Sequence, residues 1–386
     1  MPPVPRADMQ LQARAASGSP VIAAVGSHSA LDIADGAVAE GFRTLVLAAK
    51  GRERTYSRYF RAIRDATGRP VRGCVDDVWT LSSFSALAEP KALERLAQSH
   101  ALLVPNRALS SYVPLDTIED ALPVPLVGSR ALLRLEERSE RENYYALLER
   151  AGVRTPPAFV GPEAIDGLAI VKVPHATRRL ERGFFTAATP TEYREKAAAL
   201  IASGTVRADD LATARIERYV IGPVFNFNFF FSPLAARADA LELLGVDERR
   251  ESSLDGLVRL PAAEQLALGE SGRTPRYTVV GHGTLTVRES ILEEVFRMGE
   301  RFVDAAAASH PPGVIGPFCL QTCIDAEGIP WVFDVAVRIG GGTNIHLGLG
   351  HPYGNALWRE PMSTGRRIAR EIRRAREDGR LEEIVT

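Results

Sequence analysis

One lysine stands inside an otherwise apolar run, Ala169-Ile170-Val171-Lys172-Val173, which has the composition of a buried strand. A buried ammonium group is costly unless its charge is used. Lysine carries a compact charge that can reach a phosphate, and a basic stretch, residues 175–182, follows it. A later strand begins near Glu217, and its backbone up to residue 221 could hold an adenine. The segment indicates a nucleotide cleft; the alternative is an edge lysine whose amine reaches solvent.

A second pair of side chains could hold a metal ion. Gln321 and Asp334 lie on two predicted strands, residues 318–325 and 331–337, which a short turn joins. Antiparallel pairing puts the two side chains within cross-strand reach. Mg²⁺ prefers oxygen ligands and keeps waters, so this pair and the phosphates of a nucleotide would suffice. Arg338 follows and could neutralise charge on a transferring phosphoryl group. The alternative is a polar cross-strand pair without a metal.

Two loops could bind anions. Gly26-Ser27-His28-Ser29 follows a short apolar run and precedes a helical pattern, so a helix N-terminus offers free amide groups there. The full G-x-G-x-x-G pattern is missing, which disfavours a dinucleotide. The alternative is simple N-capping by Ser27 or Ser29. Further along, Gly340-Gly341-Gly342 and Asn344 form either an anion-binding nest or a tight turn.

The elements that must position these residues follow from hydrophobic periodicity. Predicted strands at residues 20–25, 44–49, 101–104 and 123–127, with a helix at 30–41, indicate an open parallel sheet of Rossmann-like type, which binds ligands at the carboxyl ends of its strands. Helices are predicted at 130–136, 142–151, 190–203 and 288–309 and from 362. Residues 214–222 and 225–231 favour antiparallel strands. Residues 245–261 have a charged, loop-like composition. The result is a mixed α/β and α+β fold.

Composition excludes several classes of function. The chain has 386 residues, 45% hydrophobic and 25% charged, with a formal net charge of −1, so it has no general basic field for nucleic acid or anionic membrane. Its three cysteines lack metal-ligand spacing and indicate a reducing compartment, which predicts a cytoplasmic protein. No apolar run approaches the ~20 residues of a membrane span. The first 20 residues lack the apolar core of a secretory signal, and we expect a disordered extension there.

Several uninterrupted stretches resemble the FAICAR synthetases, ATP-grasp enzymes that formylate 5-aminoimidazole-4-carboxamide ribonucleotide (AICAR) with formate and ATP. They are residues 26–33, Lys50-Gly-Arg-Glu53, and residues 254–261, 287–292, 311–321 and 360–371. The resemblance runs over essentially the whole chain after the leader. It implies an ATP-grasp fold with an N-terminal Rossmann-like (pre-ATP-grasp) domain: a disordered leader at 1–18, the substrate-side domain at 19–127, the nucleotide lid at 128–220 and the catalytic domain at 221–386.

The resemblance also implies a reaction and roles for matching residues. ATP would phosphorylate formate, or another small carboxylate, to an acyl phosphate that the amine of a phosphoribosyl azole nucleotide attacks, with ATP and Mg²⁺ as cofactors and a homo-oligomer as the assembly. The implied catalytic residues are Arg338 and Lys172, and the implied metal ligands are Gln321 and Asp334. The implied ATP-binding residues are Lys172, Arg182, Glu217, Tyr219 and Glu251. The implied acceptor-binding residues are Ser27, His28, Ser29, Arg107, His282 and Asn344.

Four departures from the family pattern concern these sites. Asn106-Arg107-Ala108 replaces a His-Gly-Ser segment, and His282 replaces an asparagine. Residues 176–183 replace a glycine-rich lid loop with a bulkier, arginine-rich one. Ala336 stands where ATP-grasp enzymes favour asparagine, so one metal ligand is missing and a water would complete the shell.

These departures keep two alternatives open. One is the same ATP chemistry on a related azole ribonucleotide or carboxylate, as specialised nucleoside biosynthesis would need. The other is a catalytically weak or inactive nucleotide-binding homologue, against which the retention of Lys172, Asp334 and Arg338 argues.

Overall fold

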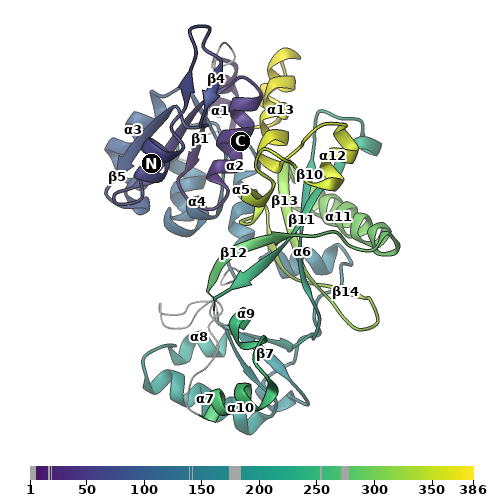
Figure 1. Ribbon diagram of the computed structural model, residues 1–386. Helices are drawn as coiled ribbons and strands as arrows, with labels where there is room; N and C mark the ends of the chain where they lie inside the picture. The colour runs from purple at the N-terminus through teal and green to yellow at the C-terminus, as the bar shows by residue number, and fades with distance from the viewer. Residues whose placement is uncertain are drawn as a thin grey trace.

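The computed structural model describes residues 6–15, 18, 20–138, 140, 142–173, 184–252, 254–270 and 278–386. Figure 1 shows three units: an N-terminal α/β unit, a C-terminal sheet with its helices beside it, and a smaller lid unit at the far end of that sheet. The lid unit comprises residues 154–173 and 184–222. The site lies where these units meet, so their packing is described first.

The N-terminal unit is built on a four-stranded parallel sheet in the order β5-β2-β1-β6. Its elements are β1 (Val21–Val25), α2 (Ala30–Ala39), β2 (Arg43–Ala49), β3 (Ile63–Arg64), β4 (Pro70–Arg72), β5 (Asp77–Leu81), α3 (Pro90–Ala97), β6 (Ala101–Leu103) and α4 (Arg107–Tyr112). The predicted Rossmann-like sheet is thus confirmed. The strand predicted at 123–127 is wrong: only single bridges form at Leu126 and Val127. Pro123 and Pro125 lack the amide hydrogens that a ladder needs.

The lid unit carries a three-stranded antiparallel sheet in the order β8-β7-β9. Its elements are β7 (Ala169–Lys172), β8 (Phe184–Ala187), α7 (Pro190–Ala202), α8 (Ala208–Ala212) and β9 (Arg215–Arg218). Before it come α5 (Arg130–Leu133), the 3-10 helix η5 (Arg134–Glu136) and α6 (Tyr144–Arg150). Figure 1 also places α9 (Leu254–Leu257) and α10 (Ala262–Glu270) beside this unit. The lid therefore receives segments from two parts of the chain.

The C-terminal unit is a five-stranded antiparallel sheet in the order β12-β11-β10-β13-β14. Its elements are β10 (Val224–Phe231), β11 (Leu241–Glu251), β12 (Val279–Thr284), α11 (Glu289–Ser309), β13 (Gly316–Ile324), β14 (Pro330–Ala336), α12 (Pro352–Trp358) and α13 (Thr364–Glu377). The predicted loop at 245–261 is wrong. Residues up to Glu251 belong to strand β11, and α9 follows. Residues 247–251, the last five of β11, are all charged, and a composition argument cannot distinguish such a run from a loop.

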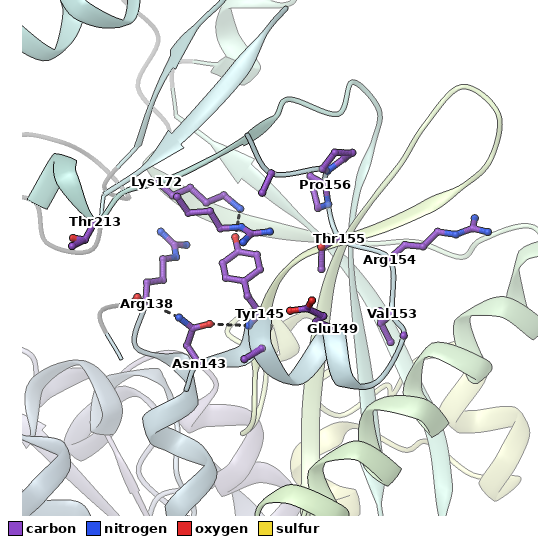
Figure 2. Close-up of a pocket in the computed structure, with 15 residues that line it drawn as sticks. Arg138, Asn143, Tyr145, Glu149, Val153, Arg154, Thr155, Pro156, Lys172 and Thr213 are labelled. Carbon is purple, nitrogen blue, oxygen red and sulfur yellow. Dashed lines mark hydrogen bonds between the residues drawn. The ribbon is translucent and has the colours of Figure 1, made fainter. Parts of the chain in front are cut away.

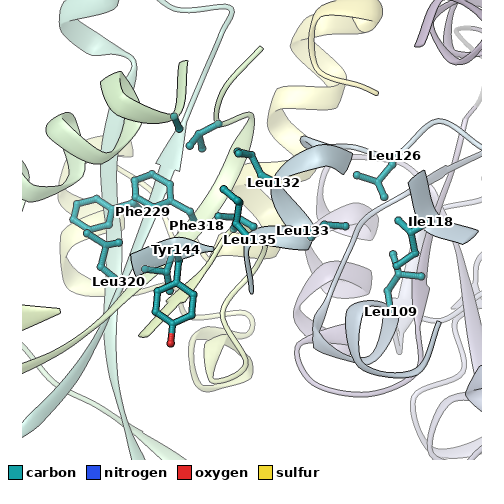
Figure 3. Packing of buried hydrophobic residues seen from close by; sticks show 14 of the residues in the cluster. Leu109, Ile118, Leu126, Leu132, Leu133, Leu135, Tyr144, Phe229, Phe318 and Leu320 are labelled. Atoms are coloured by element: carbon teal, nitrogen blue, oxygen red, sulfur yellow. The ribbon is translucent and has the colours of Figure 1, made fainter. Parts of the chain in front are cut away.

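One hydrophobic cluster joins the N-terminal and C-terminal units, as Figure 3 shows. Leu109 and Leu126 belong to its N-terminal side, and Phe229 and Phe318 to its C-terminal side. Leu132 and Leu135, from α5 and η5, lie between them and are almost completely buried. A buried leucine contributes roughly 2 kcal/mol. The segment that ends at Glu136 is therefore held firmly between the two units.

Helices α2 and α13 form a second contact between these units. A Cβ atom at Gly36 of α2 would stand 2.2 Å from the backbone nitrogen of Arg366, so only glycine allows this approach. At the end of α2 the buried Glu40 carboxylate pairs with Arg366 at 2.9 Å and with Arg370 and Arg373 at 2.7 Å. Close backbone packing and a shared carboxylate thus bind the two helices together.

The expected disordered leader is wrong for residues 6–15, which form α1 (Arg6–Ala15). Met9 and Ala13 are buried, and Gln10 donates a 2.9 Å hydrogen bond to the Glu382 carbonyl. The apolar stripe of this helix is too short to predict a helix from the sequence alone, because its partner lies near the C-terminus. Among the described residues, none of the helices combines the length and apolar character that a bilayer crossing needs.

Candidate active site

Lys172, at the end of β7, is only 5% exposed. Its amine donates to the Tyr145 hydroxyl at 2.7 Å and to the Phe333 carbonyl at 3.0 Å, and it pairs with the Glu217 carboxylate. Burial lowers the pKa of Lys172, while the Glu217 charge opposes that shift. The alternative of an edge lysine that reaches solvent is therefore wrong. Lys172 is a buried cation whose charge has partners from β9, α6 and β14.

A cavity of about 360 Å³ lies beside this lysine, between the lid sheet and the C-terminal sheet. Four of the predicted ATP-binding residues line it: Lys172, Glu217, Tyr219 and Glu251. Its apolar walls include Ile170 and Phe333, which suits a flat aromatic ring between polar rims. Arg182, the fifth predicted ATP-binding residue, lies outside the described residues.

The predicted metal pair lies next to the cavity. Gln321 of β13 and Asp334 of β14 are direct partners in the strand register, as expected. The register continues across the sheet, where Asn226 of β10 stands opposite Gln321 and Asp247 of β11 opposite Asn226. Directly opposed residues of an antiparallel sheet share one face. In the part of the chain that the structure describes, no three His, Cys, Asp or Glu side chains gather as a metal site. A metal here would depend on this pair and on phosphate oxygens.

Two arginines that sequence reasoning missed adjoin the metal pair. Arg249 of β11 donates to the Gln321 side-chain oxygen, and the Arg138 guanidinium is 3.9 Å from the Asp334 carboxylate. Burial raises the pKa of Asp334, but Arg138, Arg249 and other cations outweigh that effect and lower it overall. Asp334 is therefore ionised at neutral pH, the form that a cation binds. Arg249 lies in residues 245–261, which the sequence predicted to be a loop.

The loop at the end of β1 carries three of the predicted acceptor residues, Ser27, His28 and Ser29. Asn106 is buried there and donates to three loop carbonyls, those of Val25 at 2.7 Å and of Ser27 and His28 at 3.1 Å. Ser29 has a left-handed backbone (φ 60°) and donates to the Gly340 carbonyl. Its side chain makes no capping bond to α2, so the simple N-capping alternative is not seen at Ser29. Asn106 thus fixes the loop, in which His28 is exposed.

His28 lies in a strongly positive environment. Ser27 is within hydrogen-bond distance of its ring nitrogen Nδ1, at 2.9 Å. Loss of hydration around the ring lowers the pKa of His28 to about 4, and the positive charges of Arg338 and Arg107 contribute to this shift. The imidazole is therefore neutral at pH 7 and can form a hydrogen bond to a substrate without adding charge.

The glycine loop brings the remaining predicted acceptor residues together. A Cβ atom at Gly342 would lie 2.6 Å from the His282 ring and 2.1 Å from the Asp247 carboxylate, and one at Gly341 would lie 3.6 Å from the His28 ring. The Asn344 side chain accepts a 3.1 Å hydrogen bond from the Asp32 amide at the start of α2. His28, His282 and Asn344 therefore surround one loop.

A buried polar cluster beneath the glycine loop also escaped sequence reasoning. Asp247 accepts hydrogen bonds from the side-chain amides of Asn226 at 2.8 Å and Asn228 at 2.7 Å. Burial raises the pKa of Asp247 to about 6. The available signal was the alternation of asparagine with phenylalanine in residues 225–229, which places both amides on one face of a strand.

Arg107 and Arg338 meet at one carboxylate. Arg338 is 6% exposed and donates to Glu136 at 3.2 Å, and Arg107 donates to the same carboxylate at 3.4 Å. The predicted catalytic arginine and a predicted acceptor residue are thus linked through Glu136, which sequence reasoning did not single out.

A second cavity, of about 720 Å³, lies between α6 and the lid unit. Figure 2 shows Arg138, Tyr145 and Lys172 pointing toward one another at its centre. It shares Lys172 and Pro156 with the first cavity. Lys172, Tyr145 and Glu217 therefore form part of the boundary between the two spaces.

Two family models match the chain. One, described as a protein of unknown function (DUF1246), matches residues 22–159, and the other, described as a domain of unknown function (DUF1297), matches residues 192–386. Two curated relatives named 5-formaminoimidazole-4-carboxamide-1-(beta)-D-ribofuranosyl 5'-monophosphate synthetase are similar over 365 residues. The protein from Methanopyrus kandleri is 41% identical, and that from Methanocaldococcus jannaschii 39%, each over 95% of this chain and 94% of its own length.

Solved structures are also similar. The chain matches an IMP biosynthesis protein, PurP, from Thermococcus kodakaraensis with a TM-score of 0.68 and 29% identity over 95% of this chain and all of that one. A biotin carboxylase from Campylobacter jejuni, solved as a β,γ-ATP complex, matches with a TM-score of 0.59 and 11% identity over 93% of this chain and 72% of that one. At 11% identity, the second match is evidence for the fold alone.

Proposed function

The chain belongs to the family of 5-formaminoimidazole-4-carboxamide ribonucleotide (FAICAR) synthetases, and we propose that it joins formate to the amine of AICAR at the expense of ATP. It is a ligase with the ATP-grasp fold, which it shares with PurP and biotin carboxylase. The substrates are small molecules. In the proposed reaction the phosphoryl group of ATP moves to formate, and the amine then attacks the formyl phosphate and expels phosphate.

One observation carries the proposal. The cavity beside Lys172 is lined by Arg249, which bonds to Gln321, and by Phe333, which precedes Asp334. His28 and His282 adjoin the glycine loop. A proposed site for ATP, a proposed site for a cation and the predicted acceptor residues thus follow one another along the C-terminal sheet. That order is what transfer of a phosphoryl group followed by attack of an amine requires.

The residues present fit a magnesium ion. Asp334 is held ionised by its arginine neighbours, and Gln321 supplies a neutral oxygen directly across from it. Mg²⁺ at this pair would neutralise charge on the phosphates during transfer. Lys172 would bind a phosphate oxygen, and Arg338, beside the glycine loop, would stabilise charge on the transferring group. Closure of the lid unit would exclude the water that hydrolyses an acyl phosphate.

The two alternatives raised by the sequence are not favoured. Eight curated relatives that are 37–41% identical over 95% of the chain carry the same synthetase name. Ala336 is buried and supplies no side-chain ligand to the proposed metal. Water would complete the proposed magnesium shell.

ADP release tests the function directly. The purified protein would be assayed with ATP, Mg²⁺, AICAR and formate, with AICAR and formate omitted in turn, and the product identified by mass. We expect ADP and FAICAR in equal amounts only when all components are present. ATP binding without formate-dependent FAICAR formation would contradict the proposal and favour a nucleotide-binding homologue.

The homo-oligomeric state and the cytoplasmic location expected from the sequence stay predictions. Light scattering and cell fractionation would check them.

A further inference from the structure

Glu136 ends the 3-10 helix η5, at the point where the chain leaves the hydrophobic cluster between the two large units. Leu132 and Leu135 of the same segment are 1% and 2% exposed and lie between the N-terminal and C-terminal cores, as Figure 3 shows. The Glu136 side chain is 4% exposed. Its position is therefore fixed by core packing rather than by the groups that it binds.

The Glu136 carboxylate accepts hydrogen bonds from both units. One oxygen accepts from the Val337 amide at 3.0 Å. The other accepts from Arg338 at 3.2 Å, from Arg107 at 3.4 Å and from the Ser110 hydroxyl at 3.5 Å. One carboxylate thus fixes the backbone beside Arg338, the Arg338 guanidinium and the first residue of α4.

The two arginines are held unequally. Arg338 is 6% exposed, and its other terminal nitrogen donates to the carbonyl of the next residue, Ile339, at 2.8 Å. The side chain of Arg107 is 45% exposed and has the longer bond to Glu136. Two guanidinium charges against one carboxylate leave an excess positive charge at the cleft. An arriving anion can therefore replace Glu136 as the partner of Arg107 but not as the partner of Arg338.

We propose that Glu136 is a positioning residue that holds Arg338 permanently for phosphoryl transfer and holds Arg107 exchangeably for the phosphate of the acceptor nucleotide. The proposal rests on the proposed function. Arg107 begins α4 beside the His28 loop, which Asn106 ties to the same helix, so an acceptor phosphate at this loop lies within reach of the Arg107 guanidinium. Occupation of the acceptor site then leaves Glu136 with Arg338 as its single arginine partner, which links acceptor binding to the phosphoryl-transfer residue.

The test compares E136Q, R107A and the double variant with wild type in steady-state assays. Arg107→Ala should raise KM for AICAR about tenfold, since a charge-assisted bond to phosphate is lost. It should leave KM for the unphosphorylated AICA riboside unchanged. Glu136→Gln should lower kcat about tenfold through Arg338, with KM for ATP within about twofold of wild type. The double variant should show the KM of R107A and the kcat of E136Q.

A matched control is Glu137→Gln, a neighbouring half-buried carboxylate that bonds to neither arginine among the described residues. It should retain wild-type constants. Equal changes in KM for ATP and AICAR together with a lower Tm in E136Q would assign Glu136 a purely structural role and overturn the proposal. Loss of riboside activity in R107A equal to the loss with AICAR would also overturn it.

Failure of the proposed function can be separated from failure of this inference. Calorimetric titration of AICAR into wild-type, R107A and E136Q protein needs no turnover. If wild type binds AICAR without making FAICAR, the function fails, while weaker AICAR binding by R107A alone still supports the phosphate contact. Equal AICAR affinity in wild type and R107A would refute that contact whatever the activity.

Discussion

Asp334 is the one carboxylate of the predicted metal pair, and four nearby cations keep it ionised. Asp334→Ala should therefore abolish formate-dependent ADP release, with a loss of at least about 100-fold in kcat, since charge neutralisation at the phosphates is lost. The measurement is ADP release at saturating ATP, with Glu327→Gln in the turn of the same hairpin as the control. Retained activity in Asp334→Ala would remove this residue from the metal site.

Glu217 neutralises a buried lysine, and its removal tests that role. Glu217→Gln leaves the Lys172 ammonium without its carboxylate partner, so the free energy of unfolding should fall by about 3 kcal/mol and ATP binding should weaken. Denaturant unfolding measures the first effect and nucleotide titration the second.

The same lid unit offers a surface control for that variant. Glu163 pairs with Arg194 at 2.6 Å, with side chains 73% and 56% exposed. Glu163→Gln should cost less than about 1 kcal/mol, because exposed pairs contribute little. Similar losses in both variants would mean that the Lys172–Glu217 pair contributes no more than an exposed one.

At the residue scale, the sequence predicted several residues of the candidate site but not the charged residues that hold them in place. Lys172, Gln321 and Asp334 were identifiable because a polar side chain in an apolar strand is unusual. Glu136 and Arg249 were not, because charged residues in charged surroundings carry no such signal. Each has a partner more than 70 positions away, Arg338 for Glu136 and Gln321 for Arg249.

At the element scale, periodicity predicted most strands and helices of the sheet units, including the Gln321–Asp334 register. It failed at β11, where five consecutive charged residues, 247–251, made the end of a strand look like a loop. It also failed at α1, whose apolar stripe of Met9 and Ala13 is recognisable only once the C-terminal segment packs against it. Only α1 has a partner that is distant in sequence, since Gln10 bonds to Glu382.

The crossing of α2 and α13 gives a prediction about one glycine. Gly36→Ala should lower Tm by several degrees, because the new Cβ would stand 2.2 Å from the Arg366 nitrogen and force the helices apart. Calorimetry or circular dichroism would measure the shift.

A second helical glycine provides the matched control. Gly256 of α9 has no heavy atom within 4 Å of an added Cβ. Gly256→Ala should therefore be neutral or stabilising by up to about 1 kcal/mol, as helix propensity alone dictates. If Gly36→Ala behaved the same way, the close helix crossing would be wrong.

At the scale of the whole molecule, sequence patterns predicted a Rossmann-like unit followed by antiparallel strands but not how the units join. The joint depends on Leu132 and Leu135, on the Gly36 crossing and on Glu40 with its three arginines. Each of these looks ordinary in its own segment. The site forms only when this joint brings the His28 loop of one unit against the glycine loop of the other.

The stability of the molecule should depend on pH through two histidines buried between β11 and α12. His346 and His351 are 1% and 0% exposed, and their rings contact each other edge to face at 4.9 Å between centroids. Burial, followed by the neighbouring His351, lowers the pKa of His346 to about 3, and burial also lowers the pKa of His351. A histidine whose pKa falls on folding stabilises the fold fully above its unfolded pKa, and this contribution is lost as pH falls below that value.

The free energy of unfolding should begin to fall near pH 6.5 and continue to fall toward pH 3, at up to about 1.4 kcal/mol per pH unit for His346. Asp32 and Asp247 act in the opposite direction, because burial raises the pKa of each to about 6 and their contribution is lost as pH rises through that value.

His346→Gln isolates the contribution of the histidine: its Tm should fall less between pH 7 and pH 5 than that of wild type, whatever its Tm at pH 7. His100→Asn, a change at an exposed histidine, should follow the wild-type slope. Parallel curves for wild type and His346→Gln in scanning calorimetry would show that this buried ring does not resist protonation, and the acid sensitivity would then have to come from elsewhere in the fold.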